Sequence, residues 1–358
     1  MRLVKKIILP LALLLQLSFA QTYYSPICAA YNFSASQGDA FLTVPAARQI
    51  VFSGIVKSAE GGEIFADLSG ASADCFAKKH YVKFVSGGLK GAWFKICANS
   101  LLSLELDISE TDAAKISAGD EFKIIPFWTL DTLLPEGAGL KKSEGEISGT
   151  ECAYVFKFSY FDFGGEMRIP EGINRAPSSV FYFRKDAGGG RWVLKGDPSL
   201  ADCGGEILEP DCFLIVRTPE NFEMVLCGEV FKLPKSLVFK NLGEAAQDNF
   251  YAAPTLTALP ITALNPLIEN SIMAENSLQN PEAGDFVMAF AKSNSAENPK
   301  PEKIYFYSGT WYRTDAEFKN PAPAGGDVLE AGEALVFRLS ALSPHSQKRA
   351  EIVPEYAK

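Results

Sequence analysis

The chain has 358 residues, enough for one large or two ordinary globular domains. Its 43 acidic residues outnumber 34 basic ones, giving a formal net charge of −9, which argues against binding nucleic-acid backbones or anionic lipid surfaces. The 26 phenylalanines favour strands, because aromatic side chains fit pleated, half-buried surfaces.

Residues 1–20 have the three parts of a secretory signal peptide in order. Arg2, Lys5 and Lys6 precede an apolar run, which ends at the small-x-small cleavage site Ser18-Phe19-Ala20. The run is too short to span a bilayer, and no second hydrophobic span occurs in the rest of the chain. The sequence therefore predicts an exported protein, delivered to the periplasm, cell surface or extracellular space, with no transmembrane span in the mature chain. Cleavage removes three basic residues and no acidic one, so the mature net charge is about −12.

Short strands separated by turns dominate the mature chain. Long apolar stripes of helical period are scarce, and turns rich in Gly or Asp recur between the strands. We predict an all-β fold of duplicated β-sandwich or barrel-like units with short helical turns. The predicted strands include Phe52–Val56, His80–Val85, Trp93–Ile96, Leu101–Leu106, Phe122–Ile125, Tyr154–Phe158 and Phe213–Val216.

Composition shifts divide the mature chain. We predict an N-terminal β domain over 21–136, a linker over 137–150 and a C-terminal β region over 151–345. The linker prediction rests on its Gly, Lys, Ser and Glu content. The last residues, 346–358, are predicted to be a flexible tail.

An internal repeat is predicted within the C-terminal region, over 180–217 and 304–338. Gly204–Arg217 aligns without gaps on Gly325–Arg338, and an aromatic hairpin ending in a tryptophan precedes each segment. The hairpins turn through glycine, which supplies the positive φ that tight turns require. The chain therefore looks built from duplicated β units.

Short motifs recur along the mature chain. They are Ser25–Ile27, Gly38–Pro45, Phe52-x-Gly54-x-Val56, Gly91–Ile96 through Asn99, Asp120-x-Phe122-x-Ile124, Trp128–Leu130 and the hairpin of Trp192. With these motifs the chain resembles an uncharacterised family of bacterial exported proteins, described mainly from verrucomicrobial-type bacteria. The resemblance covers nearly all of the mature chain and implies no activity, because that family has none assigned.

Seven cysteines in an exported chain raise the question of disulfides. The odd number leaves at least one thiol unpaired or paired between chains. Cys75 and Cys97 flank a predicted hairpin and form the pair that the sequence favours. No C-x-x-C motif occurs, so zinc-knuckle and thioredoxin-type sites are not expected.

Catalytic and metal-binding motifs are not recognised. The two histidines, His80 and His345, have no nucleophile motif near them, and no metal site or cofactor is predicted. The acidic cluster of Asp107, Glu110 and Asp112 lacks the glycine-centred spacing of a calcium loop and is interpreted as a solvated loop. We therefore predict a protein that is not an enzyme.

Aromatic residues after hairpin turns are the one feature with a binding interpretation. Trp192, Trp311 and Tyr312 would form a stacking face for sugar rings if exposed, and would be core anchors if buried. Recurrence of the tryptophans at equivalent places favours the core.

Three functions remain open from the sequence. The first is an exported, non-catalytic structural or interaction protein of the bacterial cell envelope. The second is a carbohydrate-binding module-like protein that uses the aromatic residues above. The third is a carboxylate-dependent hydrolase outside the cytoplasm. The expected partner is a polysaccharide or an envelope protein.

Overall fold

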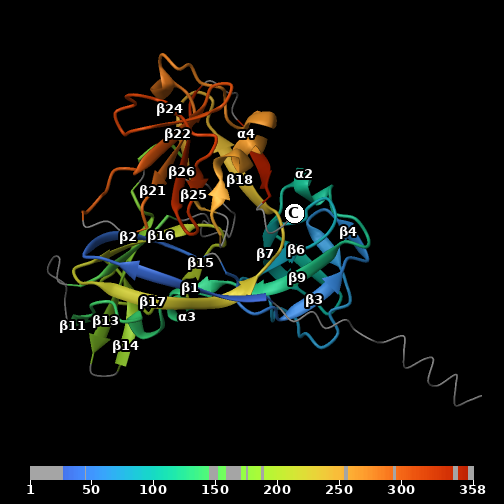
Figure 1. Cartoon of the computed structure of the whole chain (residues 1–358). Coiled ribbons are helices and arrows are strands. Elements are labelled where there is room, and N and C mark those ends of the chain that lie inside the picture. Colours follow the sequence, from blue (N-terminus) through green and yellow to red (C-terminus); the bar gives the residue numbers. More distant parts are fainter. Residues whose placement is uncertain are drawn as a thin grey trace, which may run out of the picture.

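The computed structural model describes residues 27–44, 46–144, 152–158, 171–174, 176–186, 189–253, 257–292, 296–341 and 346–353. The predicted signal peptide over 1–20 lies outside these residues, as does His345. The described chain consists mostly of strands joined by turns and a few one-turn helices, so the all-β prediction is confirmed (Figure 1). In the described residues, no helix is long and apolar enough to cross a membrane.

A curled antiparallel sheet, here called the barrel, forms one part of the molecule, at the right in Figure 1. Its strand order is β3-β9-β6-β7-β8-β5-β4, and only two residues separate β3 from β4, so the two edge strands of the sheet are consecutive in the chain. Buried phenylalanines and aliphatic residues such as Phe84, Phe122 and Ile124 fill its interior. The elements are β3 (Phe52–Ile55), β4 (Ser58–Glu60), β5 (Glu63–Phe65), β6 (His80–Phe84), β7 (Trp93–Asn99), β8 (Ser103–Leu106), α2 (Glu110–Ala113) and β9 (Glu121–Pro126).

Another part of the molecule, here called the first unit, is built from strands that precede the barrel in the chain and strands that follow it. β1 pairs with β17 and β2 with β16, so the chain enters this unit, leaves it to build the barrel, and returns. The elements are β1 (Ile27–Ala35), β2 (Gly38–Thr43), β10 (Trp128–Thr129), α3 (Leu130–Leu133), η1 (Pro135–Gly137), β11 (Ser143–Glu144), β12 (Tyr154–Lys157), β13 (Ser179–Asp186), β14 (Gly189–Leu194), β15 (Ile207–Leu208), β16 (Phe213–Thr218) and β17 (Phe222–Val230).

This pairing corrects the predicted N-terminal domain over 21–136. Its first two strands pair with strands that lie about 170 to 200 residues later, and such long-range pairing leaves no mark in local composition. The predicted linker over 137–150 is also partly wrong, because Ser143–Glu144 is β11 and pairs with β13. Residues 145–150 lie outside the described residues.

The remaining strands form the second unit, at the top of Figure 1. It ends with β27, which pairs with β18 along seven residues, so the flexible tail predicted over 346–358 is wrong for 346–352. The elements are β18 (Lys235–Asn241), β19 (Gln247–Ala252), β20 (Leu259–Pro260), η2 (Ile261–Leu264), α4 (Asn265–Glu269), η3 (Pro281–Ala283), β21 (Phe286–Phe290), β22 (Lys303–Tyr307), β23 (Trp311–Thr314), β24 (Ala322–Pro323), β25 (Val328–Leu329), β26 (Ala334–Leu339) and β27 (Ser346–Ile352).

The two units share one order of strand pairing. The first and last strands pair in each, as β1 with β17 and β18 with β27. The second strand pairs with the next-to-last, as β2 with β16 and β19 with β26. The strand order β16-β12-β13-β14 in the first unit matches β26-β21-β22-β23 in the second. The segments that align in sequence, Gly204–Arg217 and Gly325–Arg338, thus contain strands with the same place in each unit.

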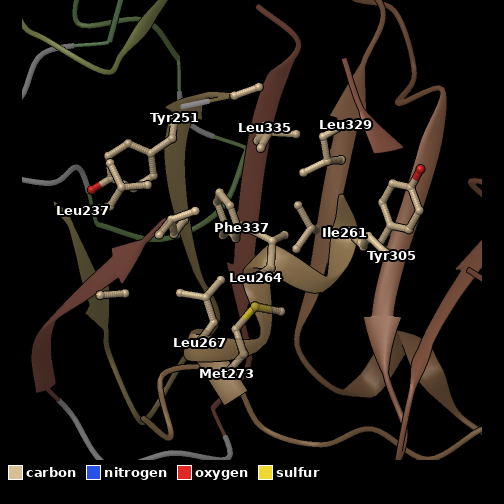
Figure 2. Close-up of a cluster of buried hydrophobic side chains, with 14 of the residues drawn as sticks. Leu237, Tyr251, Ile261, Leu264, Leu267, Met273, Tyr305, Leu329, Leu335 and Phe337 are labelled. Carbon is tan, nitrogen blue, oxygen red and sulfur yellow. The ribbon is translucent and has the colours of Figure 1, made fainter. Parts of the chain in front are cut away.

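Each unit has its own core, and a further cluster joins the two. The second-unit core gathers aliphatic residues of η2 and α4 against Tyr305 and Phe337 (Figure 2). Between the units, Phe41 and Phe213 pack with Phe250. The rings of Phe158 and Phe250 stack there with centroids 5.0 Å apart. The units are therefore held together by apolar packing of their sheets.

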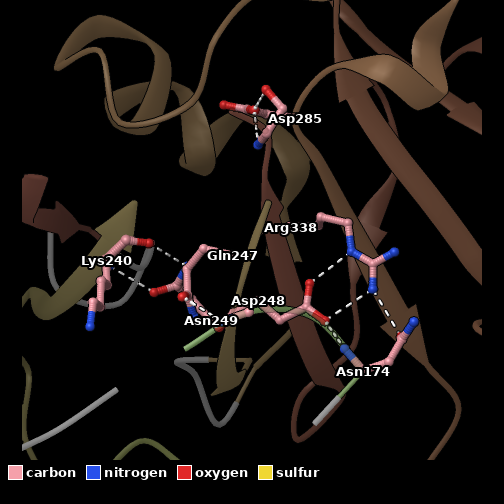
Figure 3. A network of polar contacts seen from close by, with 9 residues as sticks. Asn174, Lys240, Gln247, Asp248, Asn249, Asp285 and Arg338 are labelled. Atoms are coloured by element: carbon pink, nitrogen blue, oxygen red, sulfur yellow. Dashed lines mark hydrogen bonds and ion pairs between the residues drawn. The ribbon is translucent and has the colours of Figure 1, made fainter. Parts of the chain in front are cut away.

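Two loops cross between the units and contact matching ion pairs. In the second unit, the guanidinium of Arg338 donates to both carboxylate oxygens of Asp248 (2.8 and 3.0 Å). Asn174, from the β12–β13 loop of the first unit, accepts from Arg338 (3.0 Å) and donates its backbone N–H to Asp248 (2.9 Å; Figure 3).

The first unit repeats this arrangement with a loop of the second. Arg217 donates to both carboxylate oxygens of Asp39 (2.7 and 2.9 Å). Asn298, from the β21–β22 loop, accepts from Arg217 (3.1 Å) and donates its N–H to Asp39 (2.7 Å). Both crossing asparagines have left-handed backbone conformations, with φ of 49° for Asn174 and 52° for Asn298, which asparagine tolerates better than most residues. We call these two arrangements the crossed clasps.

Candidate functional site

The aromatic residues proposed as a stacking face lie mostly inside the protein. Trp192 is 0% exposed and meets Phe183 edge-on at 5.5 Å. Trp311 is 1% exposed, and its Nε1 donates to Asn265 Oδ1 (2.9 Å). The stacking face is therefore wrong for both tryptophans, because strand alternation turns them into the cores of their units. Tyr312, the next residue, is half-buried and stacked on Phe306.

The predicted Cys75–Cys97 disulfide is also wrong, since both cysteines are free thiols. Asn99, two residues after Cys97, is the side chain that reaches the turn containing Cys75. Its Nδ2 donates to Ser72 O (2.9 Å) and its Oδ1 accepts from Phe76 N (2.8 Å). Burial, with the nearby carboxylates of β8 and the following loop, raises the pKa of the Cys97 thiol, which disfavours the reactive thiolate.

The structure describes the surroundings of His80 and the grouping of possible metal ligands. His80 lies 3.2 Å from the carbonyl of Phe76 and edge-on to its ring, and burial lowers its pKa. Across the described ranges, no three His, Cys, Asp or Glu side chains are grouped so as to hold a metal ion. His80 is thus a packed neutral side chain at the start of β6.

An open crevice of about 710 Å³ separates the barrel from the second unit. Its walls are α2 and the neighbouring residues on one side and β27 on the other. Nearly all the side chains that line it can form hydrogen bonds, and none is aromatic. They are Ser109, Thr111, Asp112, Lys115, Val238, Asn270, Ile272, Gln347, Lys348, Arg349 and Glu351.

An ion pair joins the two walls of the crevice. The guanidinium of Arg349 in β27 donates twice to one carboxylate oxygen of Asp112 in α2 (2.8 and 3.1 Å). Lys115 donates to the other oxygen (2.8 Å). Burial opposes ionisation of Asp112, but these hydrogen bonds outweigh it and lower its pKa. The pair therefore holds the barrel against the second unit, and Asp112 is unsuited to act as a general acid.

The Asp112 cluster differs from its sequence interpretation. Glu110–Ala113 forms the one-turn helix α2, because the Ser109 side chain caps its start by accepting from Asp112 N. The predicted solvated loop is wrong for Glu110 and Asp112, which lie in a helical turn that positions Asp112 for Arg349, whereas Asp107 lies in the loop before it.

A second hollow, of only about 40 Å³, lies where the barrel, the first unit and the connection to the second unit meet. Lys83 of β6 is 5% exposed here, and its ammonium donates to Gly91 O (3.1 Å). Asp211, Glu229 and Lys235 also line the cavity. A volume of this size accommodates about three waters, so it is too small for a sugar ring. This junction is an ionic contact between parts of the protein.

Burial strongly affects the charge on Lys83. Burial and the nearby Lys235 lower the pKa of the ammonium and Asp211 opposes them, so that the pKa falls to about 8. Since the ordinary pKa is 10.5, the unfolded chain binds more protons between about pH 8 and pH 10.5. The contribution of Lys83 to the free energy of unfolding therefore rises with pH through this window.

This gives a prediction for Lys83→Met. We expect the wild type to gain about 2 kcal/mol of stability relative to the variant between about pH 7.5 and pH 9.5, and about 3 kcal/mol once the pH exceeds 10.5. Urea unfolding of both proteins across this range measures the difference. Lys115→Met, at a half-exposed lysine, is the control and should follow the wild type. If the free energies of unfolding of wild type and Lys83→Met changed with pH in the same way, the lowered pKa of Lys83 would be contradicted.

Comparison with protein-family models, with curated proteins and with solved structures finds no match to this chain. Fold and site geometry are therefore the basis for the functional proposal.

Proposed function

We propose that the chain is an exported, non-catalytic interaction protein that binds its partner in the crevice between the barrel and the second unit. The observation that carries this proposal is the crevice itself. A volume of about 710 Å³ falls within the range of ligand-binding clefts. Its central charges are already paired across the walls, so they position the surfaces that would contact a partner.

Groups that remain exposed along the crevice support binding. The side chains of Thr111, Asn270 and Gln347 are exposed and carry hydroxyl or amide groups. Hydroxyls and amides offer both donors and acceptors, which suits a hydrophilic partner such as a protein segment of the cell envelope. The proposed export of the mature chain would place the crevice in contact with such partners.

A polysaccharide is the second candidate partner. The two tryptophans are buried and do not support this candidate. The hydroxyl and amide groups that line the crevice support it, because they can hydrogen-bond to sugar hydroxyls. The hydrolase hypothesis gains no comparable support at the crevice. Both carboxylate oxygens of Asp112 accept hydrogen bonds from Arg349 or Lys115, so they are engaged in holding the walls together and not directed at a substrate.

Binding by the crevice predicts a specific mutational pattern. Thr111→Arg places a long side chain into the crevice from an exposed position, and we expect it to weaken binding to the partner about tenfold or more, an effect typical of a residue in direct contact. Glycan arrays test polysaccharides, and surface plasmon resonance tests purified envelope proteins. Thr310→Arg, in the exposed β22–β23 turn, is the matched control and should bind like the wild type.

The outcomes distinguish the candidates. Loss of glycan binding in Thr111→Arg alone would identify a polysaccharide, whereas loss of protein binding would support the first proposal. A partner that binds wild type and Thr111→Arg equally would contradict the crevice as the binding site.

A further inference from the structure

The last strand of the first unit, β17, has a partly unpaired edge. Its N–H and C=O groups alternate between the side facing β1 and the opposite side. At Glu229, both backbone groups point away from β1, since they bond to Ala47 (2.8 and 2.9 Å). By the same alternation, the backbone groups of Cys227, Val225 and Glu223 also point outward. In the part of the chain that the structure describes, none of these six groups has a backbone partner.

The pairing with Ala47 stops at Glu229 for a local reason. An added Cβ at Gly228 would lie 2.4 Å from the carbonyl oxygen of Ala47, so glycine allows the two backbones to approach there. Beyond this point no described residue pairs with the outward edge, and the side chains of Glu223, Val225 and Cys227 are exposed. Val225 is 62% exposed.

The corresponding strand of the second unit, β27, has neighbours that β17 lacks. Residues of α4 lie beside β27, and the Lys348 ammonium donates to the carbonyl oxygen of Ser271 just after α4 (2.9 Å). The crevice ion pair to α2 covers another part of β27. The open edge is therefore specific to the first unit.

We propose that the β17 edge of one chain pairs with the β17 edge of a second copy, as antiparallel strands with Val225 opposite its own counterpart. Free strand edges commonly bind another strand in this way. In this register Glu223 lies opposite Cys227 of the second copy, and all six outward backbone groups of each chain form hydrogen bonds. The twofold arrangement is closed, so it yields a dimer.

Neighbouring registers are less favourable. Shifting the pair by two residues in one direction places Glu223 opposite Glu229, a like charge whose backbone groups are already bonded to Ala47. Shifting it by two in the other direction places Cys227 opposite Asn221, which lies before the start of β17, so fewer outward groups pair within the strand. The Val225-centred register is thus the one in which all six outward groups of each chain pair within β17.

The contact is short, so the dimer should be weak and dependent on concentration. A pairing of about five residues buries less surface than the roughly 800 Å² per partner of stable complexes. Two acidic chains also repel each other. Salt should therefore strengthen association by screening that repulsion.

Sedimentation equilibrium of the mature chain under reducing conditions tests this proposal. We expect a reversible monomer–dimer equilibrium that shifts toward dimer with added salt. Val225→Lys should weaken it at least tenfold, because two ammonium groups then face each other, while thermal unfolding of the monomer stays unchanged. Leu278→Lys, at an exposed leucine of the second unit, is the control and should dimerise like the wild type.

Hydrogen exchange supplies a second readout. The amides of Glu223, Val225 and Cys227 should exchange more slowly as protein concentration increases. A monomer at every concentration, or a dimer that Val225→Lys leaves intact, would overturn the proposal. Protection of these amides only after addition of an envelope extract would overturn it too, by assigning the edge to a strand from another protein.

Discussion

Replacing Trp311 with alanine should lower the free energy of unfolding by about 3–5 kcal/mol, the range for a large aromatic side chain removed from a core. Trp311 is fully buried among the side chains of the second-unit core, with Tyr307 edge-on at 5.6 Å. The substitution also removes the indole hydrogen bond to Asn265. Chemical denaturation measures the loss.

Two variants refine this result. Trp311→Phe should cost less, because it keeps most of the apolar volume. Tyr312→Ala, on the same strand but half-buried, should also cost less. If Trp311→Ala unfolded with the wild-type free energy but no longer bound polysaccharide, Trp311 would be part of a stacking face, and its assignment to the core would be contradicted.

Removing Asp248 should be the second most damaging change, costing about 2–4 kcal/mol. Breaking a fully buried ion pair costs about 3–5 kcal/mol, and Arg338 is partly exposed, which reduces the penalty. Asp248→Ala leaves Arg338 without its carboxylate and removes the acceptor for Asn174 N–H. Asp39→Ala, in the other crossed clasp, should have a similar effect.

A surface ion pair provides the control. Glu317→Ala removes the carboxylate that pairs with Lys300, and because both side chains are well exposed the cost should stay below about 1 kcal/mol. A double-mutant cycle between Asp248→Ala and Arg338→Ala should show coupling, because the two side chains bond directly. Equal small losses for Asp248→Ala and Glu317→Ala would contradict a stabilising role for the crossed clasps.

The strand content was predictable, while the arrangement of the strands was not. Alternation in segments such as His80–Val85 and Phe213–Val216 identifies strands from local residues alone. In contrast, β2 pairs with β16 across the whole barrel sequence, and local composition carries no trace of such a partner. The predicted domain boundary at residue 136 failed for this reason. The tail prediction failed because the polar, charged residues of β27 look like solvent-exposed chain, although the strand pairs fully with β18.

The site residues were harder to find than the strands. Lys83 and Arg349 look like ordinary surface cations in the sequence. For Lys83 a signal was present, because Tyr81, Val82 and Phe84 are apolar on both faces of β6, which indicates a strand covered on both sides. For Arg349 there was none, since its partner Asp112 lies 237 residues away. Trp192 and Trp311 could be read from the sequence either as a stacking face or as core residues, and both are buried in the cores of their units.

Site-specific photo-crosslinking in the exporting cell tests the central claim most directly. A photoreactive phenylalanine analogue at Gln347, on the crevice wall, should cross-link to one main envelope component, while the same analogue at Thr310 should not. The adduct should contain the mature chain beginning at Gln21, as cleavage after Ala20 requires. Equal cross-linking at both positions, or an adduct that retains residues 1–20, would contradict an exported protein that binds its partner in the crevice.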